Sequence, residues 1–166
     1  MAARADGMTD MLIVPFRREL APAFQQLNLD WIERLFAIEE ADRKVLGDPE
    51  RAIIAPGGQI FFALEDGVPV GTVAMIRYSP TRYELAKMAV ASSYQRRGIG
   101  EKLGEVGIAF AREAGAETVF LLTNSRLNGA IRLYERLGFR RAPDPEPPEY
   151  ARADVYMELP IGRPGS

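Results

Sequence analysis

Hydrophobic and polar positions along the chain follow two different periods. Apolar residues recur every three or four positions from about Ala21 to Leu46, from Ile99 to Ala114 and from Leu127 to Leu137. This spacing predicts amphipathic helices, two of them in the first stretch. Short runs rich in apolar and β-branched residues predict strands. The predicted strands cover residues 11–16, both halves of 59–78, 83–90, 118–122 and 153–159.

The predicted order is strand, helices, hairpin, strand, helix, strand, helix and strand. It is typical of an α/β (α+β) domain with a mixed sheet. The run at 83–90 is apolar enough for a central strand, and TVFLL at 118–122 for a strand buried on both faces. The proline-rich residues 142–149 predict a loop before the last strand.

Local signals define the predicted boundaries. Asp66 and Gly67 lie between two β-rich runs, which predicts a tight hairpin turn. Gly115 and Gly138 follow helical patterns and are predicted to end them. The predicted N-cap residues are Asp30 for the second helix and Asn124 or Ser125 for the last.

Composition narrows the chemistry. The chain has 166 residues with neither histidine nor cysteine, which excludes histidine-dependent triads, thiolate nucleophiles and Cys- or His-based zinc sites. Acid–base chemistry would fall to Asp, Glu, Tyr or Lys. We expect no metal. The net charge of −2 gives no overall signal for nucleic-acid binding.

Length and hydropathy favour one domain in the cytoplasm. No apolar run approaches the ~20 residues that span a bilayer, and the N-terminus lacks the apolar core of a signal peptide. We therefore expect no membrane partner. The expected organisation is a flexible tail at 1–10, a domain at 11–160 and a C-terminal tail at 161–166.

A glycine pair between a predicted strand and helix suggests an anion site, SSYQRRGIGEKL at 92–103. A P-loop needs GxxxxGK[ST], which is absent, and a dinucleotide fingerprint needs a third glycine where Leu103 stands. The pattern Q/R-x-x-G-x-G/A, in which backbone amides bind a pyrophosphate, is matched from Gln95 to Gly100. The simpler interpretation is a plain strand–helix turn with two solvated arginines.

Two longer segments support the pyrophosphate interpretation. LAKMAVASSYQRRGIGEKL and AIRLYERLGF resemble the GNAT superfamily of N-acetyltransferases. The resemblance extends over about residues 11–160 and is most specific over 84–140. It implies acetyl-CoA as donor and a single domain flanked by helices. Its mixed, mostly antiparallel sheet would have central strands that splay apart. A homodimer is common among relatives.

The resemblance also implies particular site residues. Tyr134 would be the general acid toward the sulfur of coenzyme A, and Glu84 the base that receives the amine proton through a water. Glu39, Glu40 and Asp42 are rival bases, or would hold a cationic acceptor; Trp31 and Tyr83 are further acceptor-site candidates. The implied cofactor-binding residues are Met88, Ala89, Val90, Gln95, Arg96, Arg97, Gly98, Ile99, Gly100 and Tyr134, with Asn124 and Asn128 as weaker candidates.

One departure from the family pattern bears on those asparagines. Many relatives carry an asparagine seven residues before the tyrosine, where it touches pantetheine, and this chain has Leu127 there. Asn124 lies three residues earlier and Asn128 one residue later.

The expected function is direct acetyl transfer in a ternary complex, because no cysteine is present to carry an acyl group. The expected acceptor is a small or amino-acid-like primary amine. One alternative is a protein or peptide acetyltransferase, with the helices at 21–46 and the loop at 142–149 forming a peptide groove. Another is a non-catalytic module that binds acyl-CoA. The residues leave the acceptor and the preferred acyl length open.

Overall fold

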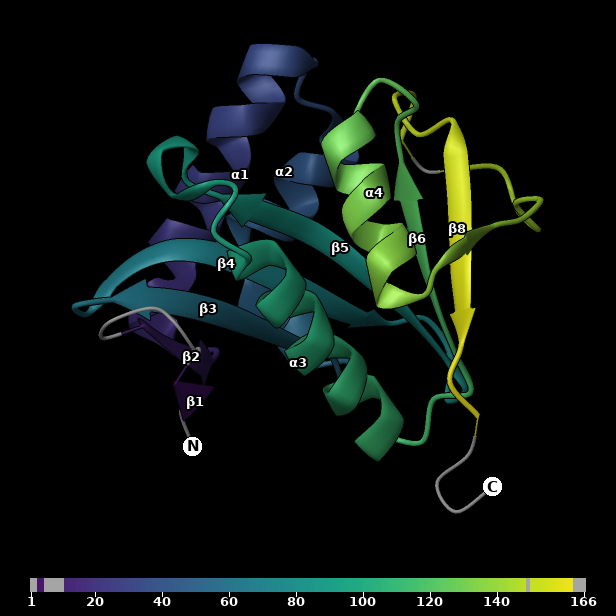
Figure 1. Ribbon diagram of the computed structural model, residues 1–166, viewed down its shortest axis with the longest axis horizontal. Helices are drawn as coiled ribbons and strands as arrows, with labels where there is room; N and C mark the ends of the chain where they lie inside the picture. The colour runs from purple at the N-terminus through teal and green to yellow at the C-terminus, as the bar shows by residue number, and fades with distance from the viewer. Residues whose placement is uncertain (1–2, 5–10, 149, 163–166) are drawn as a thin grey trace.

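An open, twisted sheet of eight strands carries helices on both faces (Figure 1). The computed structural model describes residues 3–4, 11–148 and 150–162. In chain order the strands are β1 (Ala3–Arg4), β2 (Met11–Pro15), β3 (Gln59–Glu65), β4 (Val68–Arg77), β5 (Arg82–Val90), β6 (Thr118–Thr123), β7 (Arg140–Arg141) and β8 (Val155–Pro160). Across the sheet they lie in the order β1-β2-β3-β4-β5-β6-β8-β7, and among these described strands the one parallel pair is β5 and β6.

In the described part of the chain, four α-helices cover the sheet. They are α1 (Ala21–Leu35), α2 (Glu40–Gly47), α3 (Ile99–Glu113) and α4 (Asn128–Leu137), with short turns η1 (Arg18–Leu20), η2 (Glu50–Ile54) and η3 (Ser92–Tyr94) between elements. In Figure 1, α3 and α4 lie in front of the sheet and α1 and α2 behind it. Among the residues described, no helix has the length and apolar character to cross a bilayer.

The fold agrees with the predicted class, and the predicted elements are present. Asp66 (φ 50°) and Gly67 (φ 80°) form the predicted hairpin turn, and Gly115 and Gly138 follow their helices with φ of 94° and 106°. The π-helix η2 and the short strand β7 are additions. The predicted tail at 1–10 lies outside the described residues except for β1, and only 161–162 of the C-terminal tail are described.

The predicted N-caps are wrong. α1 continues through Asp30, because Phe24 and Ile32, about two helical turns apart on its inner face, are both fully buried. The residue that caps α2 is Glu39, which forms a capping box with Asp42. The N-cap of α4 is Leu127, without a side-chain hydrogen bond.

The polar groups expected to cap α4 have other partners. The Asn124 amide donates to the carbonyl of Arg152 (2.7 Å), and its Oδ1 accepts the Arg126 N–H (2.9 Å). Ser125 donates to Asp154 through its N–H and its hydroxyl, both at 2.8 Å. These bonds tie the loop after β6 to the segment before β8.

The sheet divides the interior into two cores. Along β3, Ile60, Phe62 and Leu64 pack with the cluster of apolar side chains under α1 and α2. Ala63 packs with the cluster under α3, and the ring of Phe61 lies against that second cluster. This alternation is what a strand buried on both faces requires.

The sheet opens in the middle. β5 pairs with β4 along most of its length, but it pairs with β6 only from Arg82 to Glu84. Beyond these three residue pairs the two strands diverge, as the resemblance implied. A β-bulge adds curvature here: the register shifts between Ala86 and Ala89, and Lys87 takes a left-handed conformation with φ 53°.

Candidate functional site

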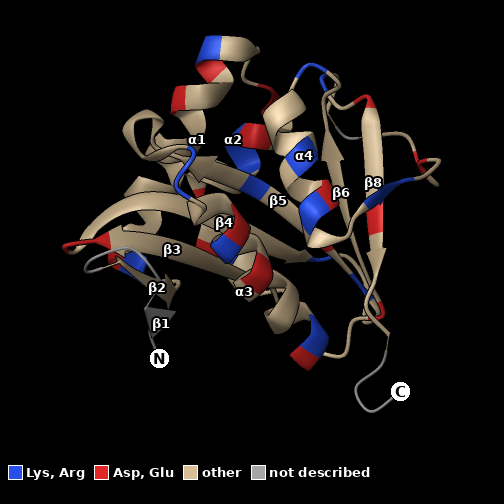
Figure 2. Ribbon diagram, in the orientation of Figure 1, with Lys and Arg blue, Asp and Glu red and all other residues tan. Residues whose placement is uncertain are grey.

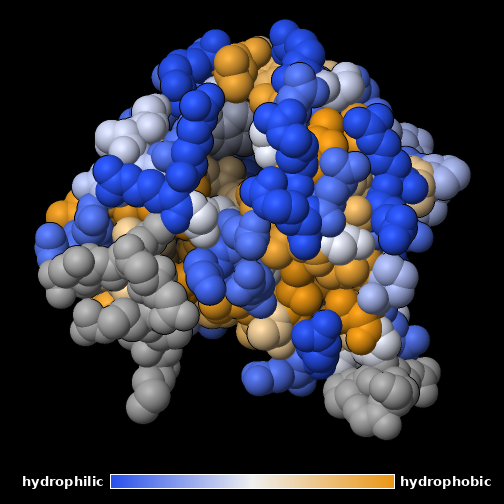
Figure 3. Space-filling view, viewed as in Figure 1, coloured by the Kyte–Doolittle hydropathy of each residue, from blue (hydrophilic) through white to orange (hydrophobic). Residues whose placement is uncertain are grey.

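A pocket of about 810 Å³ lies where β5 and β6 separate. Its walls come from β5, the loop before α3 and the start of that helix, the end of β6 and the loop after it, α4, the end of α1 and residues 150–153. Figure 3 shows the surface hollowed between α1 and α4, with hydrophilic side chains around the rim. This volume is in the range of small-molecule and cofactor sites.

The glycine loop forms one end of the pocket. Arg96 and Gly98 are left-handed, with φ of 66° and 79°, and α3 begins at Ile99. Alternating backbone conformations before a helix turn successive N–H groups toward one point, and the first N–H groups of the helix have no intrahelical partner. A Cβ at Gly98 would meet no atom within 4 Å, so an anion has room to approach.

The open edge of β5 forms one wall. β4 takes the hydrogen bonds on one side of β5, while on the other side β6 has moved away beyond Glu84. Glu84, Met88, Ala89 and Val90 line the pocket along this edge. The side-chain amide of Gln95 donates to the Val90 carbonyl (3.2 Å), which joins the end of β5 to the glycine loop.

Tyr134 lies in the opposite wall, on α4. Its ring meets Phe139 edge-on, with centroids 6.2 Å apart. Burial raises the pKa of Tyr134 to about 12. The phenol therefore keeps its proton at neutral pH, as a proton donor must.

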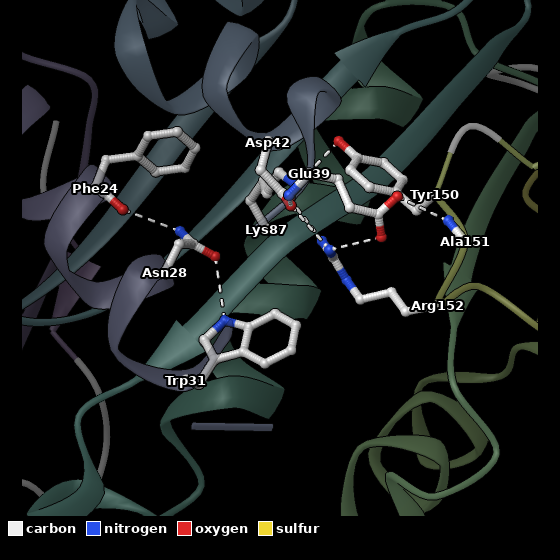
Figure 4. A network of polar contacts seen from close by, with 9 residues as sticks. All are labelled: Phe24, Asn28, Trp31, Glu39, Asp42, Lys87, Tyr150, Ala151 and Arg152. Carbon is white, nitrogen blue, oxygen red and sulfur yellow. Dashed lines mark hydrogen bonds and ion pairs between the residues drawn. The ribbon is translucent and has the colours of Figure 1, made fainter. Parts of the chain in front are cut away.

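A buried charge network lies beside the pocket (Figure 4). Asp42, which is fully buried, accepts hydrogen bonds from the Arg152 guanidinium at 2.6 and 2.8 Å and from Lys87 Nζ at 2.7 Å. Lys87 also contacts the Tyr150 hydroxyl (3.0 Å). The network joins α2, the bulge of β5 and the loop before β8.

The pKa values in this network reflect a competition between burial and pairing. Burial alone would raise the pKa of Asp42, but the hydrogen bonds from Arg152, Lys87 and the Glu39 N–H hold it well below its usual range. Burial lowers the pKa of Lys87, against the opposing effect of Asp42. Asp42 thus lies between two cationic side chains, both of which donate hydrogen bonds to it.

Some predicted site residues lie outside the pocket lining. Tyr83 is buried under α3, with its ring against Phe110 and its hydroxyl donating to the Gly57 carbonyl (3.3 Å). Arg97 is exposed and stacks on the Tyr94 ring at 4.9 Å.

The predicted acceptor carboxylates have protein partners. Glu39 accepts from the Ala151 N–H (2.9 Å) and from Arg152 (3.3 Å). Glu40 is exposed and pairs with Arg43 (3.6 Å). With Asp42 in the network, all three carboxylates thus have cationic partners within the protein.

The structure brings the other predicted residues together around one cavity. Those that line it are Trp31, Glu84, Met88, Ala89, Val90, Gln95, Arg96, Gly98, Ile99, Gly100, Asn124, Asn128 and Tyr134.

Several residues that line the pocket were not predicted. They include Arg34 in the last turn of α1, Phe36 just after that helix, Lys87, Arg126, Tyr150 and Arg152. Two signals could have found some of them. Lys87 is a charge inside the otherwise apolar run at 85–90, and Arg126 comes three residues after the end of a buried strand, β6, that runs parallel to β5. The carboxyl ends of adjacent parallel strands meet at one edge of a sheet, where ligands commonly bind.

Among the residues described, no three His, Cys, Asp or Glu side chains gather in a group that could hold a metal ion. Several cationic residues line the pocket, from the glycine loop, α4 and the last turn of α1. Figure 2 marks Lys and Arg positions in blue along these segments of the ribbon.

Comparison with known proteins identifies related sequences. A protein named "Probable N-acetyltransferase camello" from Xenopus tropicalis is 35% identical over 103 residues, and the N-acetylaspartate synthetase of Danio rerio is 36% identical over 103 residues. These matches cover 60% and 61% of this chain but 47% and 36% of the two relatives. The chain thus spans less than half the length of either.

Solved structures share the fold. A GNAT-family acetyltransferase from Staphylococcus aureus Mu50 superposes with a TM-score of 0.82 at 22% identity, over 91% of this chain and 99% of that one. The acetyltransferase yncA of Salmonella typhimurium, solved with its cofactor acetyl-CoA, gives 0.75 at 20% identity, over 95% and 98%. The model of the acetyltransferase (GNAT) family matches residues 13–139. Because that match covers well over half of the sequence, this chain belongs to the acetyltransferase (GNAT) family.

Proposed function

We propose that this chain is an acetyl-CoA-dependent N-acetyltransferase that acts on a small primary amine. The observation that carries the proposal is the open edge of β5 beyond Glu84, which faces a pocket with the glycine loop at one end and Tyr134 in its wall. A thioester donor with a long polar arm needs such an arrangement: an anion site, a strand edge for the arm, and an acid near the sulfur.

The backbone of this chain would bind the donor. In this proposal the N–H groups of residues 95–100 bind the pyrophosphate, helped by the positive end of the α3 dipole. The free edge of β5 from Met88 to Val90 exchanges hydrogen bonds with the pantetheine arm. An N–H group there also stabilises negative charge on the thioester carbonyl oxygen. Acetyl-CoA, when bound, supplies the acetyl group as a thioester.

Two side chains would move the protons. An alkylammonium with a pKa of about 10.4 must lose a proton before it attacks, and Glu84 receives that proton through a water. The new C–N bond forms as the C–S bond breaks. The nitrogen gives up two protons in total, and the first is released through Glu84. The neutral phenol of Tyr134 donates its proton to the departing sulfur. The second proton from the nitrogen then returns the phenol to its neutral form.

Relatives support a small acceptor. One matched protein is named N-acetylaspartate synthetase, which implies a small amine that also carries carboxylates. The pocket volume of about 810 Å³ must hold both the end of the donor arm and the acceptor.

Binding of the donor is the first test. A ligand at 100 times its Kd stabilises the native state by about 2.7 kcal/mol, which for a chain of this size raises Tm by about 5–10 °C. Acetyl-CoA should produce this shift, whereas ATP and NAD should not.

Paired glycine variants control for folding. Gly98→Glu and Gly115→Glu each place a side chain at a left-handed position where a Cβ meets no atom within 4 Å. Both variants place glutamate at a positive φ, 79° at Gly98 and 94° at Gly115, but of the two only Gly98 lines the pocket. Gly98→Glu should abolish the shift by acetyl-CoA and Gly115→Glu should keep it. An equal response in the two variants would contradict the assignment of the loop.

Turnover distinguishes the remaining functions. Release of free coenzyme A with small amines supports the proposed enzyme. Binding of acetyl-CoA without turnover of any amine or peptide would instead indicate a non-catalytic binding module. Turnover of peptides alone would indicate a peptide acetyltransferase.

A further inference from the structure

The cationic side chains that line the pocket differ in whether a carboxylate of the protein pairs with them. Some cations have protein partners: Arg136 pairs with Glu101 (2.9 Å), and Lys87 and Arg152 pair with Asp42. Arg126, farther along the lining, has no carboxylate oxygen within 4 Å among the residues described. An acceptor in this pocket therefore meets excess positive charge.

Arg126 lies near the N-terminal end of α4, whereas the glycine loop lies near its C-terminal end. It comes between the end of β6 and the first residue of α4, whereas α3 and the glycine loop contact the later turns of that helix. A rise of about 1.5 Å per residue puts Tyr134 about 9 Å along α4 from Asn128. Arg126, Glu84 and Tyr134 all line the same pocket, so one small molecule bound there can contact Arg126 and the proposed reacting groups.

The local structure orients the Arg126 guanidinium. Its Cζ lies 4.7 Å from the centroid of the Phe36 ring, as in a cation–π contact. Its Nε makes a long hydrogen bond to Asn124 Oδ1 (3.4 Å), and the same oxygen accepts the Arg126 backbone N–H (2.9 Å). Asn124 is itself fixed by its bond to the Arg152 carbonyl.

The terminal nitrogens of Arg126 are left available. Within the described part of the chain they have no hydrogen-bond acceptor. The carboxylate of Asp154, on which Arg126 acts only through its charge, is bonded instead to Ser125. A guanidinium held through Nε presents its two terminal groups as a fork that matches a carboxylate in a bidentate geometry.

We infer that the acceptor is a free amino acid whose carboxylate is bound by Arg126, while its amine points toward β5. This inference rests on the proposed acetyltransferase function. A polyamine or another multiply cationic acceptor is disfavoured, because the carboxylates that could hold a second ammonium, Glu39 and Asp42, are already paired with Arg152.

Matched acceptors test the role of the carboxylate. The full chain would be assayed for coenzyme A release with the free amino acids, with their carboxamides and with the corresponding decarboxylated amines. Free amino acids should be the best substrates. Equal or faster turnover of the decarboxylated amines, of diamines, or of peptides with a distant carboxylate would overturn the inference.

Variants of Arg126 test whether its side chain binds the acceptor carboxylate. Arg126→Gln should raise KM for the amino acid about 10–100-fold, since hydrogen bonds to a charged group typically have this effect. KM for the carboxamide and for acetyl-CoA should stay unchanged. Arg126→Lys should restore part of the loss, because it keeps the charge without the fork. Arg43→Gln, on the exposed face of α2, is the control and should match the parent.

The outcomes distinguish a failure of this inference from a failure of the proposed acetyltransferase function. Equal loss for amino acid and carboxamide in Arg126→Gln would show a structural role and overturn the inference. Acetyl-CoA binding without turnover of any amino acid would overturn it while leaving other acceptors for the enzyme. Failure to bind acetyl-CoA would overturn the proposed function and, with it, this inference.

Discussion

Replacement of Asp42 by asparagine tests the buried charge network most directly. The Asp42 carboxylate accepts four hydrogen bonds, from Lys87, from two nitrogens of Arg152 and from the Glu39 N–H, all between 2.6 and 2.8 Å. Asparagine keeps the shape but loses the charge, and it turns an NH₂ group toward groups that are themselves donors. Lys87 and Arg152 would then be buried charges without compensation.

The magnitude follows from that burial. The side chains of Asp42, Lys87 and Arg152 are 0%, 5% and 12% exposed, so solvent can replace little of the lost interaction. Removal of one partner of a buried pair costs about 3–5 kcal/mol. For a chain of this length we expect Tm to fall by roughly 6–20 °C.

Calorimetry or denaturant unfolding of Asp42→Asn measures the loss. The control is Glu40→Gln, which removes the same charge from an exposed position on the same helix and should change the free energy of unfolding by at most about 0.5 kcal/mol. A loss below about 1 kcal/mol in Asp42→Asn would refute the reasoning. The loss in Asp42→Asn/Lys87→Met should be smaller than the sum of the single losses.

The pH dependence gives a second check. The pKa of Asp42 is depressed in the folded protein, so the carboxylate contributes its stability above the unfolded-state pKa of about 3.9. That contribution is lost as pH falls through the folded-state pKa. The gap in stability between the parent and Asp42→Asn should therefore be constant near neutral pH and narrow in acid below about pH 4.

Two further predictions concern turnover. Tyr134→Phe should lower kcat by about 10²–10⁴-fold with little change in KM for acetyl-CoA. An unchanged kcat in this variant would remove Tyr134 as the acid. Because the pKa of Tyr134 is raised to about 12, the rate of the parent enzyme should show no loss from ionisation of this phenol below pH 10. Glu84→Gln should lower kcat over a similar range and alter the shape of the pH–rate profile, whereas an unaltered profile would require another base.

The sequence predicted elements better than long-range contacts. The period of the apolar residues identified the strands and helices, because each pattern reflects burial within one segment. Asp30 was assigned as a cap since its residue type favours that position, but the buried face of α1 spans it and outweighs a single capping bond. Local propensity is a weak guide wherever packing on both sides continues the same element.

The pocket was only partly predictable. The glycine loop, the edge of β5 and Tyr134 lie in segments whose motifs carry the resemblance, and the structure puts all of them on the lining of one cavity. Asp42, Lys87 and Arg152 pair across separations of 45 and 110 residues, and no local pattern records such pairing. The same is true of Arg126 over Phe36.

The short ladder between β5 and β6 has a mechanical consequence. Only three residue pairs join the strands at the centre of the sheet, so the C-terminal unit of β6, α4, β7 and β8 is attached to the rest mainly by side chains. The packing of Leu137 on Gly104 and the ion pairs of Arg136 and Arg152 are among those attachments. Such a unit can open without global unfolding, and its amide hydrogens should exchange faster than those of β3 and β4. A ligand bound between β5 and β6 would contact both parts of the sheet and should slow that exchange.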